Sequence, residues 1–366
     1  MKQKILKFTC LLFAGLIAVN IFCGNLVKVN AYFSKFTVVA DGKEYVFYQP
    51  EIYYGLDGLT LLGEEQIVDR IIADNKISST DARVDFTPAG KQLFTYYKQK
   101  SGRIIDKQKA IAKIEYALHS GKNKVVLTSE KVDAKVTLEE LKKQTVKKSY
   151  FCTEYLYSSK ERKHNIALAV SYLSGAIIDP GATFSFNQTV GKREEERGFL
   201  TAKVIQDGKF VDGVGGGVCQ VSTTLYNAIL LAGLTVIESH NHSLAVDYVQ
   251  PSFDAMVSDY TSDLKFVNNT NSPIYILGSA DGERVSFTIF GVKNEYEYRL
   301  VSTVTEIIEG KTLTEKRRDG SEVDLIKKDG LKSEGYLQVY KEGVLLQTVK
   351  LRCDTYKPRD GVVYID

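Results

Sequence analysis

A run of three consecutive glycines at 215–217 constrains this chain more than any other feature of its sequence. Glycine enters positive-φ conformations without steric cost and lets backbone segments approach closely. The segment GVGGGVCQVSTTLYNA (213–228) places Cys219 directly after this run and at the start of a helical pattern. We therefore predict a tight turn that delivers Cys219 to the first turn of a helix whose apolar positions run over 221–232.

The position of Cys219 predicts a reactive thiol. A helix N-terminus stabilises negative charge, so a thiol placed there loses its proton more readily. His240 and His242 follow about twenty residues later, and an imidazole within reach completes an activated nucleophile. The alternative interpretation is a glycine-packed strand–helix junction in which the cysteine is a small buried side chain.

The two histidines are predicted to share one face of a strand over 236–248, because alternate residues of a strand point the same way. We take His242 as the base and Asp254, twelve residues further on, as the carboxylate that orients its ring. This order of residues and elements is similar to that of papain-like and transglutaminase-like thiol enzymes, although an interval of 23 residues between Cys219 and His242 is short for them. The alternative is a histidine and an aspartate that form hydrogen bonds in turns.

Further residues are expected to line a binding cleft around this thiol. The backbone N–H groups of Cys219 and Gln220, or the side-chain amide of Gln220, are natural donors to an oxyanion. The expected binding residues are Gly215, Gly216, Gly217, Gln220, Thr223, His240 and Asn187. Thr223 and Asn187 have a second interpretation, as residues that cap helices or hydrogen-bond to the local backbone.

A zinc site is a third interpretation of the same side chains. His240, His242 and Cys219 together with a carboxylate are plausible zinc ligands. No Cys-x-x-Cys pair and no His-Glu-x-x-His segment accompanies them. We therefore predict neither a metal nor a cofactor.

The charge balance argues against nucleic-acid binding. The net charge is only +3 over 366 residues, and no stripe of Lys and Arg interleaved with aromatic residues is present. A hydrophobic content of 44% and a charged content of 25% are typical of a globular protein. The length is sufficient for two or three domains, each with its own core.

The first residues predict export from the cytoplasm. Three lysines precede an apolar run over 8–23, and Val29-Asn30-Ala31 is typical of a signal-peptide cleavage site. The run is also long enough for an uncleaved membrane anchor, so residues 1–31 are a signal peptide or an anchor. Beyond it the chain has three cysteines, which form at most one disulfide. We expect a protein that is either secreted or membrane-anchored outside the cytoplasm.

The hydrophobic patterns predict a multi-domain α+β protein. A first α+β domain is expected over 36–149, ending in a lysine-rich linker at 142–148, and a central α+β domain over 150–292. A small β-rich module is expected over 298–366, with a hairpin turn at Glu342-Gly343.

Several separate motifs of the central domain resemble one known family. They are NIALAV (165–170), DPGATFSFNQTVGKR (179–193), GGGVCQVSTTLYNA (215–228), HNHS (240–243) and DAMVSDYTSDLKFVNNT (254–270). In this order they resemble the VanW domain, found in exported Gram-positive proteins and named for a gene of vancomycin-resistance clusters. Residues 36–149 resemble a peptidoglycan-binding domain that often precedes VanW, and the tail is similar to a five-glycine extracellular module but has few of its glycines.

The resemblance implies a role in the cell envelope, in association with the cell wall. It does not indicate a reaction, which has to be inferred from the residues. The first hypothesis is an exported protein that binds and modifies peptidoglycan or its stem peptides, with Cys219 attacking an amide, His242 moving the proton and Asp254 orienting His242. Hydrolysis and transpeptidation share these steps. The alternative is a non-catalytic wall-binding or assembly scaffold that uses the same cleft.

Overall fold

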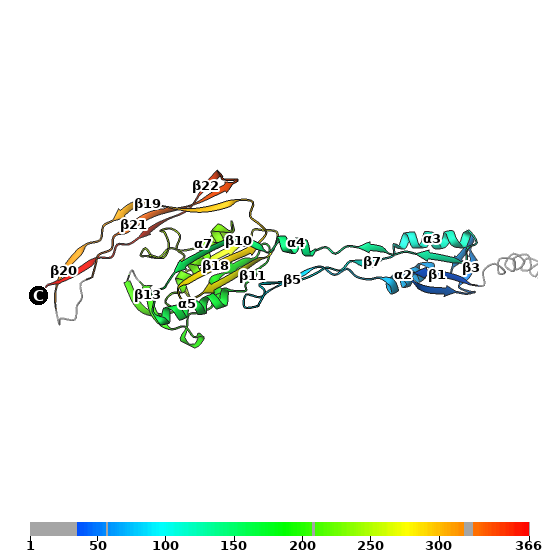
Figure 1. Ribbon diagram of the computed structural model, residues 1–366, viewed down its shortest axis with the longest axis horizontal. Helices are drawn as coiled ribbons and strands as arrows, with labels where there is room; N and C mark the ends of the chain where they lie inside the picture. Colours follow the sequence, from blue (N-terminus) through cyan, green and yellow to red (C-terminus); the bar gives the residue numbers. More distant parts are fainter. Residues whose placement is uncertain (1–34, 56–57, 207–208, 318–324, 366) are drawn as a thin grey trace, which may run out of the picture. The chain divides into compact units, whose positions relative to one another are not determined.

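The computed structural model describes residues 35–55, 58–206, 209–317 and 325–365. The predicted signal peptide or anchor at 1–31 lies outside these residues. The chain divides into two compact units (Figure 1): unit 1 holds the residues up to Arg83 together with Tyr97–Leu138, and unit 2 holds Val84–Tyr96 together with the residues from Glu139 onward. Within the described ranges, no helix is long and apolar enough to cross a membrane.

Unit 1 is built around a three-stranded sheet covered by two helices. Strand β1 (Phe36–Ala40) lies between β2 (Lys43–Phe47), which is antiparallel to it, and β8 (Lys124–Leu127), which is parallel. The helices are α2 (Glu64–Asn75) and α3 (Lys107–His119). Val38, Ile71 and Ile114 are fully buried where these elements meet. The remaining paired strands of unit 1 are β3 (Ile52–Gly55) with β4 (Gly58–Leu61), and β7 (Gly102–Ile104) with β9 (Glu130–Val132). Strands β5 (Arg83–Phe86) and β6 (Phe94–Tyr97) pair with each other and lie almost entirely in the segment Val84–Tyr96 of unit 2.

Unit 2 contains a four-stranded antiparallel sheet with two helices packed on it (Figure 1). The strand order is β10 (Val146–Glu154), β18 (Arg284–Gly291), β17 (Ile274–Ala280) and β11 (Ile177–Ile178). Helix α7 (Val218–Leu231) packs against β10 and β18, and α5 (Lys160–Leu173) packs against β17 and α7. The smaller elements are α4 (Leu138–Lys143), α6 (Phe186–Val190), the 3-10 turn η1 (Glu195–Arg197), the sheet β12 (Thr183–Ser185), β16 (Lys265–Val267) and β15 (Thr235–Glu238), and the hairpin β13 (Thr201–Gln206) and β14 (Lys209–Val214).

Helix α7 is enclosed on all sides, although five of its buried residues are polar. Those residues use their side chains to hold neighbouring elements: Thr224 Oγ1 lies 2.8 Å from Thr153 Oγ1 on β10, and Asn227 Nδ2 donates to the carbonyl of Phe253 at 2.8 Å. Ser222 Oγ donates to the Ala255 carbonyl at 2.5 Å. Because a buried polar group is stable only when it is hydrogen-bonded, these residues fix segment 253–257 against the helix.

The C-terminal part of unit 2 is the predicted β-rich region. Its long antiparallel strands are β19 (Glu297–Ile308), β21 (Gly330–Lys341) and β22 (Val344–Tyr356), and β20 (Thr312–Lys316) pairs with β23 (Gly361–Ile365). The predicted turn at Glu342-Gly343 joins β21 to β22, and both residues have positive φ, as a two-residue hairpin turn requires. The predicted α+β class is confirmed.

Two local predictions were wrong. No strand runs over 236–248: β15 ends at Glu238, His240 pairs with Met256 in an isolated bridge, and the backbone N–H of His242 donates to a side chain of Asp254 instead of a strand. The lysine-rich stretch 142–148 is not a linker, because it contains the end of α4 and the start of β10. Lysines are compatible with a strand when their long side chains reach solvent from its surface.

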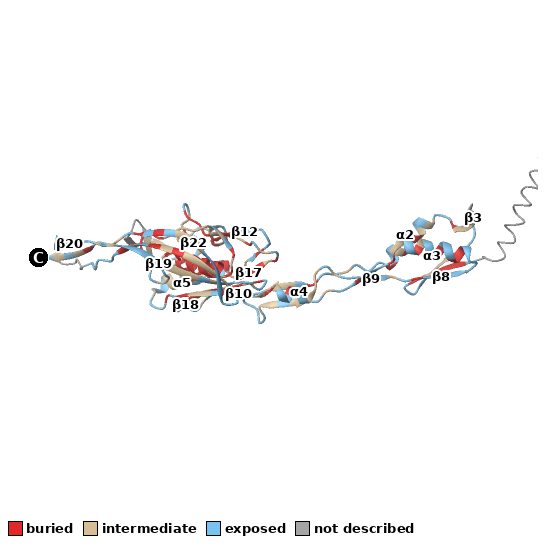
Figure 2. Ribbon diagram, turned by 90° about the horizontal axis from the view of Figure 1, so that it is seen from above, coloured by how far each residue is buried: buried red, intermediate tan, exposed pale blue. Residues whose placement is uncertain are grey.

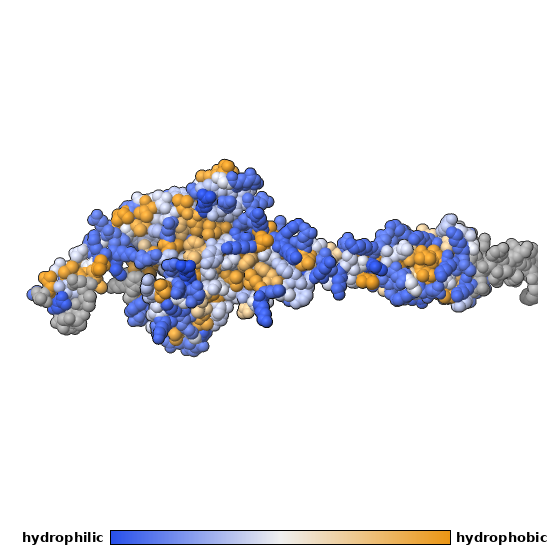
Figure 3. Space-filling model, in the orientation of Figure 1, coloured by the Kyte–Doolittle hydropathy of each residue, from blue (hydrophilic) through white to orange (hydrophobic). Residues whose placement is uncertain are grey.

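Buried residues are concentrated where α5 and the four-stranded sheet of unit 2 meet, as Figure 2 shows. On the face drawn in Figure 3, apolar residues form separate patches bordered by hydrophilic residues on each unit. Cys152, Cys219 and Cys353 are free thiols. These three cysteines therefore form no disulfide, and each unit is stabilised by its own hydrophobic core.

Candidate active site

The turn before α7 has the strained geometry that its glycines predict. Gly215 and Gly217 have φ of 85° and 108°, and Gly217 is the N-cap residue of α7. A Cβ atom on Gly217 would lie 2.9 Å from the Ile166 side chain, and one on Gly216 would lie 2.7 Å from the carbonyl of Lys203. Both the backbone conformation and the close packing therefore require glycine. The helix begins at Val218, earlier than its apolar pattern indicates, and Cys219 lies in its first turn.

Cys219 opens into a cavity of about 420 Å³. The Sγ atom lies 3.3 Å from the carbonyl oxygen of Val257, and the side chain is half-buried. This volume is within the range of small-molecule sites in proteins. The cavity is lined by the glycine run, Arg162, Arg193, Lys203, Gln220, His242, Tyr248 and Asp259, together with aliphatic side chains that include Val204, Val246 and Met256.

His242 and Asp254 form a buried pair next to this thiol. His242 Nδ1 lies 2.7 Å from Asp254 Oδ2, and the backbone N–H of His242 donates to the same oxygen at 2.6 Å. Only 5% of the histidine side chain and 1% of the aspartate side chain are exposed. Because Nδ1 is engaged by the carboxylate, Nε2 is the ring nitrogen left to interact with Cys219, which acts on the pKa of His242.

The second oxygen of Asp254 is held by strand β22. Tyr356 donates its hydroxyl to Asp254 Oδ1 at 2.6 Å, and Arg352 Nη2 lies 3.1 Å from the same oxygen. Arg352 also donates through Nε to Asp354 at 2.6 Å. All the polar contacts of the buried carboxylate therefore come from one histidine and from two residues of the C-terminal strands.

These contacts favour a thiolate–imidazolium pair. Burial by itself raises the pKa of the Cys219 thiol, but the hydrogen bond and positive charge of His242, with a smaller contribution from Arg193, bring it below the usual value. Burial opposes the charged form of His242, yet its hydrogen bonds to Asp254 and Cys219 raise its pKa to about 9. Burial also disfavours the carboxylate of Asp254, but His242, Arg352 and Tyr356 outweigh it and lower its pKa. A thiolate is the nucleophilic form of cysteine.

One backbone group at the start of α7 is free to bind an oxyanion. The N–H of Gln220 already donates to the carbonyl of Gly217 at 3.0 Å. The N–H of Cys219, in contrast, makes no hydrogen bond within the described chain. Of the two backbone donors expected from the sequence, only that of Cys219 is available.

The side chain of Gln220 is buried and does not point its amide at the thiol. Its Nε2 donates to Thr153 Oγ1 at 2.9 Å and to the Glu154 carbonyl at 2.8 Å. Its Oε1 accepts from Arg162 Nη2 at 2.7 Å. The expected oxyanion role of the Gln220 side chain is therefore wrong, and this residue holds Arg162 at the cavity.

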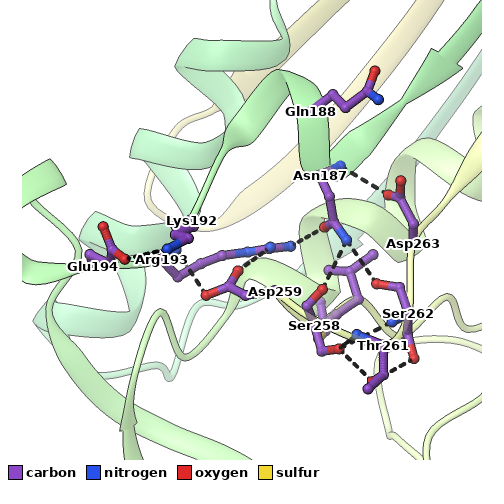
Figure 4. A network of polar contacts seen from close by, with 12 residues as sticks. Asn187, Gln188, Lys192, Arg193, Glu194, Ser258, Asp259, Thr261, Ser262 and Asp263 are labelled. Carbon is purple, nitrogen blue, oxygen red and sulfur yellow. Dashed lines mark hydrogen bonds and ion pairs between the residues drawn. The ribbon is translucent and has the colours of Figure 1, made fainter.

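Asn187 lies outside the cavity, in the polar network shown in Figure 4. Its Nδ2 donates to the carbonyls of Ser258 and Ser262 at 2.8 and 2.9 Å, and its Oδ1 accepts from Arg193 at 2.6 Å. Arg193 also forms an ion pair with Asp259. Asn187 therefore positions a cavity residue and is not itself a lining residue.

Thr223 and His240 are also separate from the cavity. Thr223 is fully buried, and its Oγ1 accepts from the Ala255 N–H at 2.9 Å. His240 Nε2 lies 3.1 Å from Glu238 Oε1, and His240 lines a different cavity, near β19 and β22. The prediction that His240 and His242 share a face is therefore wrong, because no strand continues through the two residues. No group of three His, Cys, Asp or Glu side chains suited to a metal ion is present among the described residues.

Four functional candidates were not identified from the sequence: Arg162, Tyr248, Arg352 and Tyr356. Arg162 lies in a helical pattern in which an arginine is ordinarily solvated. Arg352 and Tyr356 lie about one hundred residues beyond Asp254. Only the alternation of β22, which turns both side chains to the same face, is a signal that could have associated them.

Comparison with known proteins identifies relatives of the central region. Residues 161–290 match the family described as VanW like protein. The uncharacterized protein YoaR of Bacillus subtilis (strain 168) is 36% identical over 176 residues, which cover 48% of this chain and 58% of YoaR. The vancomycin B-type resistance protein VanW of Enterococcus faecalis (strain ATCC 700802 / V583) is 30% identical over 135 residues, which cover 35% of this chain and 49% of that protein. The chain thus spans about half the length of these curated relatives, and no solved structure matches it.

Proposed function

We propose, from the premise that this chain is a VanW-like protein, that it is an exported cell-envelope enzyme that uses Cys219 to cleave or exchange an amide bond in peptidoglycan stem peptides. The observation that carries the chemistry is the buried His242–Asp254 pair, with Nδ1 and Oδ2 2.7 Å apart, whose histidine lines the same cavity as Cys219. The matched region, 161–290, contains all three residues.

The reaction follows from the protonation states of the pair. The Cys219 thiolate attacks the amide carbonyl, and the Cys219 N–H donates to the oxyanion that forms. The imidazolium of His242 then protonates the leaving amine, so the C–N bond breaks and a thioester remains on Cys219. Water completes a hydrolysis, or a second amine completes a transpeptidation, with His242 accepting the proton of the incoming nucleophile.

The choice of substrate is supported by context. The start of the chain is typical of an export signal, and the two relatives come from Bacillus subtilis and Enterococcus faecalis, the second being named for vancomycin resistance. Outside such a cell, the peptide amides of the wall are the abundant amide substrate. The peptidoglycan partner, a membrane attachment through the N-terminal segment and the extracytoplasmic location are part of this proposal.

The reactivity of Cys219 tests whether its thiol is activated, as the proposed function requires. We expect the rate of alkylation by iodoacetamide, followed by mass spectrometry of the Cys219 peptide, to rise with a midpoint below pH 8.5, the usual thiol value. The His242→Gln variant should shift that midpoint upward. If the alkylation rate of Cys219 in the wild-type protein rises with a midpoint at or above pH 8.5, the result would contradict the proposed enzymatic activity and favour a non-catalytic scaffold.

A turnover assay tests whether peptidoglycan stem peptides are the substrate. Purified protein incubated with muropeptides should release an amine, detected by chromatography and mass spectrometry, and the Cys219→Ala variant should release none. A Cys219→Ala protein that fully restores the phenotype of a deletion strain, while muropeptide binding is retained, would support the non-catalytic scaffold instead.

A further inference from the structure

Arg162 differs from the other cations that line the Cys219 cavity. Its Nη1 donates to Ser158 Oγ at 2.7 Å and its Nη2 to Gln220 Oε1 at 2.7 Å. Both acceptors are neutral, and no carboxylate of the described chain forms an ion pair with this guanidinium. Burial disfavours its charged form and lowers the pKa of Arg162. A desolvated cation of this kind is stabilised by an anion.

The neighbouring cations already have acidic partners. Arg193 forms an ion pair with Asp259, and Lys203 Nζ lies 2.9 Å from Asp212. Arg162 is therefore the cavity-lining cation that lacks an acidic partner within the described chain. The cavity therefore has one cation without a carboxylate partner, and this cation lies on the wall that also carries Cys219.

The guanidinium is held in place beside the nucleophile. Gln220, its acceptor, directly follows Cys219, and the aliphatic part of Arg162 packs on Gly217, where an added Cβ would lie 3.0 Å from Arg162 Cγ. Nη1 and Nη2 each have a second N–H that these hydrogen bonds do not use. A guanidinium binds a carboxylate in a bidentate manner through two of its N–H groups.

We propose that Arg162 binds a carboxylate of the substrate, so that the cavity accepts short peptides with a free carboxylate close to the amide that Cys219 attacks. The attack itself rests on the proposed function, whereas the carboxylate recognition does not. In a stem peptide the carboxylate belongs either to the C-terminus or to a γ-linked glutamate.

Binding measurements separate these sources without any turnover. The protein is the full chain with Cys219→Ala, and the probe is the N-acetylated pentapeptide Ala-γ-D-Glu-Lys-D-Ala-D-Ala, measured by isothermal titration calorimetry. Two further probes carry an amide in place of the terminal carboxylate or of the glutamate α-carboxylate. Amidation of the recognised carboxylate should weaken binding by about 10- to 100-fold.

The same comparison in variants identifies the residue responsible. With Arg162→Gln added, the affinities for the carboxylate and amide probes should become equal, whereas Lys203→Gln, a cation on the same cavity with an acidic partner, should keep the difference. Arg162→Lys should keep part of it, because it retains the charge but not the fork. The amide probes test the proposal on protein with an intact Arg162 even where a variant fails to fold.

The outcomes distinguish this inference from the proposed function. Equal binding of all three probes, an absence of binding to any of them, or a difference that persists in Arg162→Gln would overturn the carboxylate site. A second result is possible, in which the probes are distinguished through Arg162 but the wild-type protein never cleaves the pentapeptide. This result would support the carboxylate site and contradict the proposed enzymatic activity.

Discussion

At the scale of the residue, the central feature is a thiol whose charge depends on a buried histidine. The environment of Cys219 alone would keep it neutral, because burial raises its pKa. His242 reverses this only while it is itself charged, and Asp254 keeps it so by accepting from both Nδ1 and the backbone N–H. Three groups thus share one protonation equilibrium.

Removing the carboxylate of Asp254 should make the Cys219 thiol less reactive. In Asp254→Asn the imidazolium loses its anion, so the pKa of His242 falls from about 9 and the pKa of Cys219 rises. We expect iodoacetamide alkylation of Cys219 at pH 7 to slow by about tenfold, the effect of one pKa unit, and the midpoint of its pH profile to move to higher pH.

A matched variant controls for the loss of a negative charge near the cavity. Asp247 also lines the cavity but is exposed and pairs with Lys328, so Asp247→Asn should leave the alkylation profile unchanged. Identical profiles for both aspartate variants would show that Asp254 does not set the charge of the pair.

At the scale of the element, α7 is placed by its first turn and by its polar residues. Gly217 adopts a left-handed conformation and packs on α5, and Ser222, Thr223 and Asn227 fix segment 253–257. The apolar pattern of this helix could be identified from the sequence. The partners of its polar residues could not, because they come from segments distant along the chain.

A substitution of Gly217 should separate backbone strain from packing. Gly217→Ala combines a positive φ with contacts of 2.9 Å to Ile166 and 3.0 Å to Arg162. Gly181→Ala has a φ of 73° and no atom within 4 Å of the added Cβ. We expect unfolding in urea to show a loss of about 1–2 kcal/mol for Gly181→Ala and a further loss of about 1–3 kcal/mol for Gly217→Ala. Equal losses would show that the space beside Gly217 is not limiting.

At the scale of the whole molecule, the C-terminal strands complete the site. The family match ends at residue 290, yet Arg352 and Tyr356 of β22 bind the carboxylate that orients His242. The β-rich region at 298–366 was expected to be an accessory module. In the structure it contributes two of the residues that hold Asp254.

Substitutions on β22 measure that contribution. Arg352→Met leaves Asp254 and Asp354 with one cation fewer in a buried site, so we expect a loss of about 3 kcal/mol in the free energy of unfolding and slower alkylation of Cys219. Lys350→Met lies on the same strand, where the partially exposed lysine pairs with Glu334, and should leave the free energy of unfolding close to the wild-type value. A Cys219 reactivity that stays at the wild-type level in Arg352→Met would show that β22 stabilises the fold without affecting the thiol.

Local information in the sequence determined helix α7, the hairpin at Glu342-Gly343, the glycine turn and the assignment of Cys219, His242 and Asp254 as a group. Apolar periodicity is a pattern of residues close together in the chain, and the backbone freedom of glycine belongs to the residue itself. Both can therefore be identified from the sequence alone. Only the tertiary structure decided that His240 turns away, that Gln220 supports Arg162, and that Arg352 and Tyr356 hold Asp254. These outcomes depend on which buried polar groups find partners when distant segments pack together, and that selection is made by the folded chain as a whole.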